Sequence, residues 1–120
     1  MMNYSTVVAQ LLERLPEFAK YDPAPDADLP HDVFGSFALF LCEEIRKSDP
    51  HSQDDTLKRA FEFINEMAMA RDIEVVNLLV VSVLEQIGDD EHCRAAAINH
   101  LSTETRMLLQ RTLDGWLEDH

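Results

Sequence analysis

Two residues of the kind that bind zinc, Cys93 and His100, lie seven positions apart in a stretch with helical periodicity. This spacing puts them on one face of a helix, two turns apart. A zinc site needs about four ligands, commonly grouped in close pairs such as CxxC or HxxxH, and the sequence has no such pair. A di-iron bundle needs repeated Glu-x-x-His, whereas Asp89 and His92 give that separation once and with Asp. A small metal-binding helical bundle is therefore the least favoured interpretation, and we predict no metal and no cofactor.

Catalytic chemistry has no better support. Glu43-Glu44 and Asp54-Asp55 are adjacent carboxylate pairs, but neighbouring side chains on a helix point about 100° apart and do not converge. No serine stands in a GxSxG elbow, and the three glycines are isolated, so that no glycine-rich phosphate loop exists. We therefore predict that the protein is not an enzyme and has no catalytic residues.

Acidic side chains form the clearest cluster of functional groups. Four carboxylates fall within seven residues that straddle the end of one expected helix and the start of the next, where several can project to one side. We predict that they bind a partner: Glu85, Asp89, Asp90 and Glu91. A second candidate group lies in a proline-rich loop that would lose entropy on docking: Asp22, Asp26, Asp28 and Asp32. The competing structural interpretation is that Asp89 or Asp90 only caps the following helix.

Net charge limits the class of partner. The chain has 23 Asp and Glu against 10 Lys and Arg, which gives a formal net charge of -13. Nucleic-acid backbones and anionic membranes attract Lys and Arg, so we predict neither as a partner. A basic protein partner is favoured because opposite fields accelerate encounter. The alternative is that the acidity only keeps the protein soluble.

Hydrophobic periodicity predicts an all-α single domain over residues 1–120, with about six helices in an antiparallel bundle or α-α stack. An acidic, proline-rich loop is expected at 22–32, and Ser5, Asp72 and Ser102 are the expected N-caps. The expected helices cover residues 5–15, 32–47, 55–71, 72–87, 90–100 and 103–117, with a further turn at 17–21.

The expected helix at 72–87 has the least polar surface and should lie at the centre of the fold. A strand is the alternative for VVNLLVVSV, but about fifteen residues is long for a strand and Gly88 is a typical helix stop. We expect its core face to contain Ile73, Val76, Val80, Val83, Leu84 and Ile87.

The two cysteines, Cys42 and Cys93, lie in apolar helical stretches outside any CxxC spacing. We expect two buried free thiols, with one disulfide as the alternative. The first ten residues, MMNYSTVVAQ, have no basic region and no long apolar run, so we expect no signal peptide. Together these features predict a cytoplasmic, reducing location.

Three segments carry a resemblance to a known family. In chain order they are VFGSFALFLCEEI, LKRAFEFINEMA and VVNLLVVSVLEQIGDD, roughly within residues 33–91. They resemble a family of small bacterial helical proteins of unknown function, and proteins of this kind look like the immunity proteins that accompany secreted bacterial toxins. The resemblance implies a cytosolic neutraliser of a toxin domain, without catalytic residues, and nuclease toxins are usually basic.

Charge and resemblance together favour a non-catalytic, acidic protein-binding domain, most concretely an immunity protein that neutralises a basic bacterial toxin domain. The alternative is a helical adaptor or regulatory subunit of an ordinary cellular complex. A toxin gene directly beside this gene would favour the first interpretation over the second.

The periodicity gives a direct test of the fold. We expect far-UV circular dichroism to show helix over about 60% of the residues and no sheet signal, because every long periodic segment has a period near 3.6. A substantial strand component would contradict the all-α prediction.

Overall fold

The computed structural model describes residues 2–22, 28–47 and 55–114, and all regular structure in these ranges is helical. Because α5, η1 and α6 run on without a break, the described part contains seven helices, of which residues 73–89 form the central one. The bounds are α1 Val7–Arg14, α2 Pro16–Tyr21, α3 Pro30–Lys47, α4 Asp55–Ala68, α5 Ile73–Leu78, the π-helical η1 Leu79–Leu84, α6 Glu85–Asp89, α7 Glu91–Ala97, the 3-10 turn η2 Ile98–His100 and α8 Thr103–Leu113.

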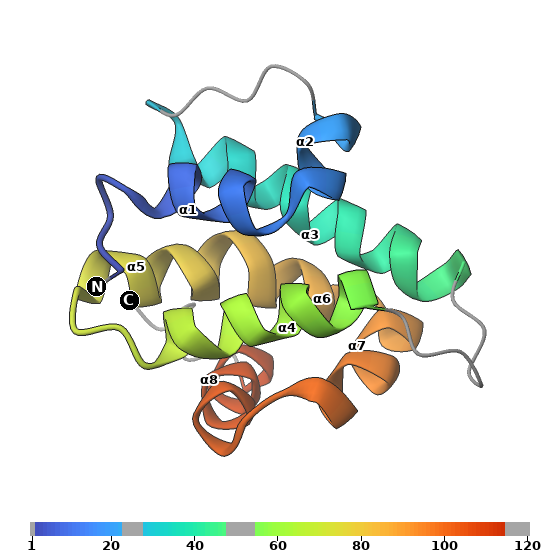
Figure 1. The fold of residues 1–120 in the computed structure, drawn as a ribbon. Helices are drawn as coiled ribbons and strands as arrows, with labels where there is room; N and C mark the ends of the chain where they lie inside the picture. The colour runs from blue at the N-terminus through green and yellow to red at the C-terminus, as the bar shows by residue number, and fades with distance from the viewer. Residues whose placement is uncertain (1, 23–27, 48–54, 115–120) are drawn as a thin grey trace.

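The helices pack around the central helix from several sides. Figure 1 shows α1 and α2 on one side of it, next to α3, and α8 on the opposite side. α4 contacts both α8 and η1, so it closes the layer between them. The Cα radius of gyration is 13.4 Å, close to the value of about 13.6 Å for a compact domain of this length. The prediction of one all-α globule is confirmed.

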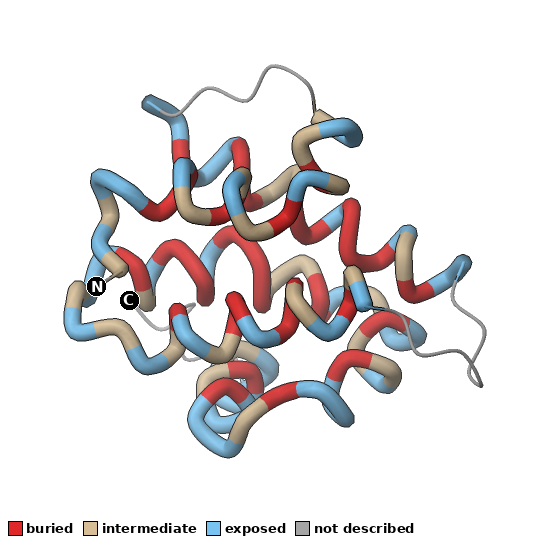
Figure 2. The backbone as a smooth tube through the Cα atoms, viewed as in Figure 1, coloured by how far each residue is buried: buried red, intermediate tan, exposed pale blue. Residues whose placement is uncertain are grey.

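Aromatic side chains fill the space between α2, α3 and α4. Phe18, Phe34, Phe37 and Phe63 are fully buried, and they meet mainly in edge-to-face pairs. The Phe18 and Phe37 ring centroids, for example, lie 5.6 Å apart at an interplanar angle of 71°, a geometry that aromatic rings favour. Figure 2 shows the resulting buried stripe of each helix turned toward the interior.

The central helix is buried as expected, but the buried face of its first turns differs from the predicted one. Ile73 is 74% exposed and Val76 is half-buried, whereas Val75, Leu78 and Leu79 are fully buried. The π turn at Leu79–Leu84 is the physical reason, because its wider turn rotates the buried stripe relative to a regular α-helix. The predicted placement of Ile73 in the core is therefore wrong. The other predicted core residues that are buried are Val80, Val83, Leu84 and Ile87.

Most predicted helix ends and caps agree with the structure. Asp72 caps α5 by accepting from the Glu74 N–H, and Ser102 caps α8 by accepting from the Thr105 N–H. The expected cap at Ser5 is wrong, because the first helix begins at Val7 after Thr6 and has no side-chain cap. Part of the expected loop (23–27) and the predicted end of the last helix (115–117) lie outside the described residues.

Cys42 on α3 and Cys93 on α7 form a disulfide, with Cα atoms 5.5 Å apart. The prediction of two free thiols is therefore wrong, and the alternative that the sequence left open is confirmed. Apolar surroundings predicted burial correctly, but the crossing of α7 over α3 is a tertiary feature that the spacing of the two cysteines does not reveal. No helix within the described ranges has the length and apolar composition needed to cross a membrane.

An ion-pair cluster fixes the start of α4 to the junction of α1 and α2. Arg59 Nη1 donates to Glu17 Oε1 at 3.2 Å and to the Arg14 carbonyl oxygen at 3.1 Å, and a second guanidinium nitrogen pairs with Glu17 Oε2. The Thr56 hydroxyl donates to Glu17 Oε2 at 2.8 Å. The hydrogen bond from Arg59 lowers the pKa of Glu17 from 4.5 to about 2, against the opposing effect of burial.

The lowered pKa of Glu17 predicts acid sensitivity of the fold. The unfolded chain binds this proton near pH 4.5 and the folded chain near pH 2, so the stabilisation is complete above pH 4.5 and is lost as pH falls toward 2. We expect Glu17→Gln to flatten the dependence of melting temperature on pH in that window, while lowering stability at neutral pH. An unchanged slope in thermal melts between pH 2 and 4.5 would contradict this role.

Candidate functional site

Of the four carboxylates of the first predicted group, Glu85 and Asp89 line one pocket, and Asp90 and Glu91 do not. Glu85 starts α6 and is half-buried, and Asp89 ends α6 and is exposed. Asp90 lies between α6 and α7, and Glu91 is the exposed first residue of α7. The structure therefore places Glu85 and Asp89 on one helix and turns the other two toward different surroundings.

Asp90 has a structural role. Its Oδ1 accepts from the Cys93 N–H at 3.0 Å and thereby caps α7, and its other oxygen pairs with Arg46 of α3. The hydrogen bond from the Cys93 N–H, followed by the charge of Arg46, lowers the pKa of Asp90. The capping interpretation considered for this residue is confirmed.

Glu85 and Asp89 line a pocket of about 560 Å³ between the end of the central helix and the end of α8. We call it the α6–α8 pocket. Asp114, at the end of α8, supplies a third carboxylate to it. Lys and Arg are absent from its lining among the described residues, and Glu85 and Asp89 make no ion pair there. The remaining lining residues are Val81, Gln86, Gly88, Thr112 and Leu113.

Gly88 allows α8 to approach this closely. A Cβ atom built at Gly88 would lie 3.2 Å from Leu113 Cδ2, which is tighter than ordinary van der Waals contact. Val81 is 37% exposed and Leu113 is 42% exposed, so the carboxylates stand beside open apolar surface. Sequence reasoning missed Asp114 as a site residue, because only the docking of α8 brings it to Glu85 and Asp89.

The second predicted group remains spread over three segments. Asp22 is half-buried and ends α2, Asp28 is exposed before α3, and Asp32 is exposed in the first turn of α3. Asp26 lies outside the described residues. None of the three described members lines the α6–α8 pocket, so this group gives less support to a defined binding site.

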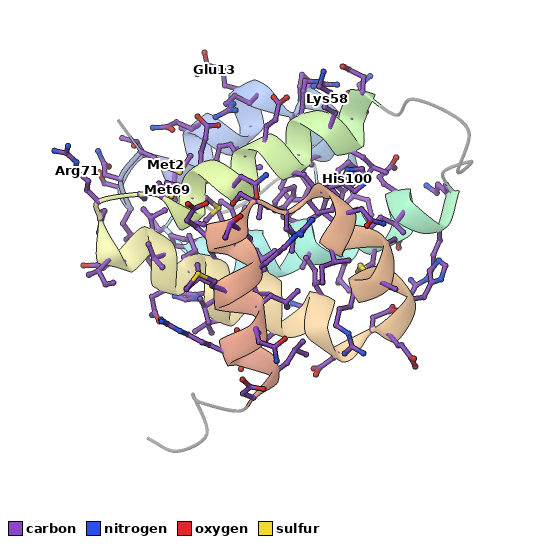
Figure 3. All side chains as sticks on the ribbon, turned by 90° about the horizontal axis from the view of Figure 1, so that it is seen from below. Met2, Glu13, Lys58, Met69, Arg71 and His100 are labelled. Carbon is purple, nitrogen blue, oxygen red and sulfur yellow. A yellow bond between two sulfur atoms is a disulfide. The ribbon has the colours of Figure 1, made fainter. Side chains whose placement is uncertain are left out.

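The residues on which a metal site would depend have other partners. Cys93 is bonded to Cys42, and the ring of His100 stacks on Phe61 with centroids 4.8 Å apart and an interplanar angle of 11°. His100 lies at the α7–α8 connection, where Figure 3 shows it turned toward the body of the molecule. Within residues 2–22, 28–47 and 55–114 no three His, Cys, Asp or Glu residues gather as metal ligands could.

One serine–histidine pair occurs on the π turn. Ser82 Oγ lies 2.7 Å from His31 Nδ1, which resembles the contact of a nucleophile with its base. Ser82 is only 6% exposed, however, and neither residue lines the α6–α8 pocket, so a substrate held in that pocket does not reach the hydroxyl. The pair therefore ties the start of α3 to the central helix.

Asn65 of α4 has a comparable structural role at the start of α8. Its Nδ2 donates to the His100 carbonyl oxygen at 3.1 Å, and its Oδ1 accepts from the Ser102 N–H and the Thr105 hydroxyl, each at 2.9 Å. This amide also borders a pocket of about 640 Å³. Met2, Met69 and Arg71 lie close together at that end of the molecule in Figure 3. Because Glu66 and Glu104 line the same pocket as Arg71, the pocket favours neither a positively nor a negatively charged ligand.

Asp89 and Asp90 give a direct comparison of a surface carboxylate with a capping one. We expect Asp90→Ala to lower the melting temperature by several degrees, because α7 loses both its cap and its ion pair with α3. Asp89→Ala, the matched control, should leave the melting temperature nearly unchanged. Because the pKa of Asp90 is lowered, the difference between the two variants should shrink as pH falls through the acidic range. Equal melting temperatures at neutral pH would refute the capping role.

Comparison with known proteins places this geometry in a family. The chain matches the family described as a domain of unknown function (DUF7674) over residues 8–117, and it belongs to that family. Among curated proteins and among solved structures, none matches the chain.

Proposed function

We propose that this member of the DUF7674 family is a non-catalytic protein-binding domain, and that it binds a basic protein at the α6–α8 pocket. The observation that carries the proposal is the composition of this pocket. It brings Glu85, Asp89 and Asp114 together from two helices without a neighbouring cation among its lining residues. Gln110 Nε2 donates to Asp114 Oδ1 at 3.0 Å, but no ion pair joins the three carboxylates to a described Lys or Arg, so their charges are available to a cation from outside.

The pocket fits a lysine or arginine side chain of the partner. The aliphatic part of such a side chain can lie on the exposed surface of Val81 and Leu113, while its charged end reaches the carboxylates. Asp89 and Asp114 are exposed and Glu85 is half-buried, so binding does not require three charges to lose their water completely. The usual penalty of burying an ion pair is therefore reduced.

The overall charge supports the same class of partner. A formal net charge of -13 attracts a basic surface over distances of about 8–10 Å at moderate salt and accelerates its encounter. Charges at the rim of an interface mainly set the association rate, whereas buried groups mainly set the dissociation rate. We expect Glu85 to act in the second way and Asp89 and Asp114 in the first.

Toxin neutralisation is the more specific form of this proposal. It is supported by the resemblance of residues 33–91 to immunity-like helical proteins and by the acidity that a basic toxin domain would require. In this form the domain covers a basic cleft of the toxin and blocks it without chemistry of its own. The neighbouring gene should then encode a basic toxin domain, and co-expression of this chain should restore growth that the toxin stops.

The pocket can be tested with variants matched in charge. Glu85→Gln/Asp89→Asn/Asp114→Asn removes three negative charges from the pocket, and Glu13→Gln/Glu62→Gln/Glu74→Gln removes three from elsewhere, so both change the net charge from -13 to -10. Glu13 projects from α1 into solvent, away from the pocket (Figure 3). We expect the pocket variant to bind a ten-lysine peptide, and the neighbouring gene's product, with an association rate lower by roughly tenfold or more. The control variant should lose much less.

Thermal melts of both variants show whether a lower association rate reflects loss of binding groups or loss of folded protein.

Association with the wild-type protein should slow as salt rises, because the attraction is screened. Equal losses in the two variants would show that only overall charge matters, and unchanged rates in both would end the proposal for a basic partner. A neighbouring gene that encodes no toxin would contradict the proposal of toxin immunity. The proposal that the pocket binds a basic protein would still be tested by the association rates.

A further inference from the structure

Two contacts placed one above the other hold α7 against α3. Cys42 and Arg46 lie four residues apart on α3, and Asp90 and Cys93 lie three residues apart at the start of α7, so each pair lies on one face of its segment. The disulfide joins Cys42 to Cys93, and an ion pair joins Arg46 to Asp90. One link is covalent and responds to redox conditions, while the other is ionic and half-exposed.

Apart from these two contacts, α7 is attached mainly to its neighbours in the chain, where Arg94 Nη1 donates to the Gly88 carbonyl oxygen at 2.7 Å. Of its seven residues only Cys93 and Ala97 are buried, and both side chains are small. The main aromatic core lies elsewhere, between α2, α3 and α4, and contains no residue of α7. Loss of the disulfide would therefore remove the strongest attachment of α7 and leave the large core side chains in place.

The two sulfur atoms differ in access. Cys42 is 7% exposed and Cys93 is 1% exposed, so an external thiolate would reach the Cys42 sulfur more readily. Attack there forms a mixed disulfide with Cys42 and releases Cys93 as a thiolate, which takes up a proton. A second external thiol then attacks the mixed disulfide and leaves both cysteines as thiols. The sum consumes two small thiols and yields one small disulfide, so atoms and electrons balance.

We propose that Cys42 and Cys93 form a reversible modification site for small thiols such as glutathione, and that reduction releases α7 while the rest of the domain stays folded. The disulfide spans a sequence separation of 51 residues, and its closure lowers the entropy of the unfolded chain. Reduction therefore lowers global stability as well as loosening α7 locally. The core of five fully buried phenylalanines keeps the reduced protein folded: Phe18, Phe34, Phe37, Phe61 and Phe63.

The redox state also bears on the proposed binding surface, and this consequence rests on the function proposed above. The pocket residues Glu85 and Asp89 lie on α6, which packs directly against α7. In the disulfide form α7 is fixed and supports this side of α6. In the dithiol form that support is weakened, and a partner would have to order Glu85 and Asp89 on binding.

The first experiment measures the redox step and the release of α7 without any partner. The oxidised protein is incubated with reduced glutathione at about 5 mM, a concentration typical of reducing conditions, and free thiols are counted by alkylation and mass spectrometry. We expect both cysteines to become reactive, and amide exchange in 91–97 to accelerate by about tenfold or more, with exchange in α3 and the central helix little changed. The melting temperature should fall by on the order of 10 °C.

A variant without the thiols gives the matched control. Cys42→Ala/Cys93→Ala should exchange like the reduced protein and should not respond to glutathione. A disulfide that survives this treatment, exchange at 91–97 that is unchanged on reduction, or unfolding of the whole domain on reduction or in the variant would each overturn the proposal. Survival would make the bond a permanent structural cross-link, unchanged exchange would show that other contacts hold α7, and global unfolding would show that the bond supports the whole fold.

A second experiment separates this proposal from the proposed function. Binding of the ten-lysine peptide is measured for the oxidised and the reduced protein at equal salt. We expect weaker binding after reduction, by about threefold to tenfold, since α6 and its pocket residues Glu85 and Asp89 lose the support of a fixed α7. Failure of both forms to bind, with the exchange result as expected, would sink the proposed function and leave the redox site standing. Equal binding by both forms would overturn the link between them.

Discussion

The burial of one apolar helix governs this fold. Most apolar side chains of residues 73–89 are buried, so water must be excluded from this helix on several sides, apart from its first turn and the residues that border the α6–α8 pocket. A single neighbouring helix cannot do this, and the chain therefore places α3, α4 and α8 around it on different sides. The remaining helices complete this enclosure: α1 and α2 cover α3, and α7 closes the end near α6. The polar contacts between the covering helices mainly fix the positions of these helices relative to one another, because each such contact adds little net stability.

The sequence was sufficient for the helices because each has a clear start, a clear stop or a regular apolar stripe. Asp72 and Ser102 are recognisable N-caps, and Pro16 separates two helices because it lacks an N–H and fixes its own backbone. The exposure of Ile73 was not predictable in this way, since it depends on a π turn whose extra residue rotates one half of a helix against the other. Nor was the disulfide, because Cys42 and Cys93 come together only through the path of the intervening helices.

Only part of the candidate site could be predicted from the sequence. Glu85 and Asp89 lie one turn apart on a helix, so local periodicity is enough to put them together. Asp90 follows immediately in the sequence but points to α3, since a residue that caps a helix has its side chain fixed by the N–H groups it serves. Asp114 reaches the same pocket from a separate helix, and no rule of spacing joins residues that are 25 positions apart (89 and 114). Acidic composition and local spacing thus predicted only part of the candidate site.

Gly88 gives this pocket a vulnerability of a different kind. The approach of α8 depends on the missing Cβ atom at that position, because an added carbon would press on Leu113. An alanine there would widen the spacing between the two helices by a few tenths of an ångström or force Leu113 into another rotamer. The first response moves Asp114 relative to Glu85 and Asp89, and the second changes the apolar lining beside them, in both cases without changing any charge. Among proteins of this family, retention of the three acidic residues alone would therefore be a poor guide to a shared specificity, whereas retention of the small residue beneath them would be a better one.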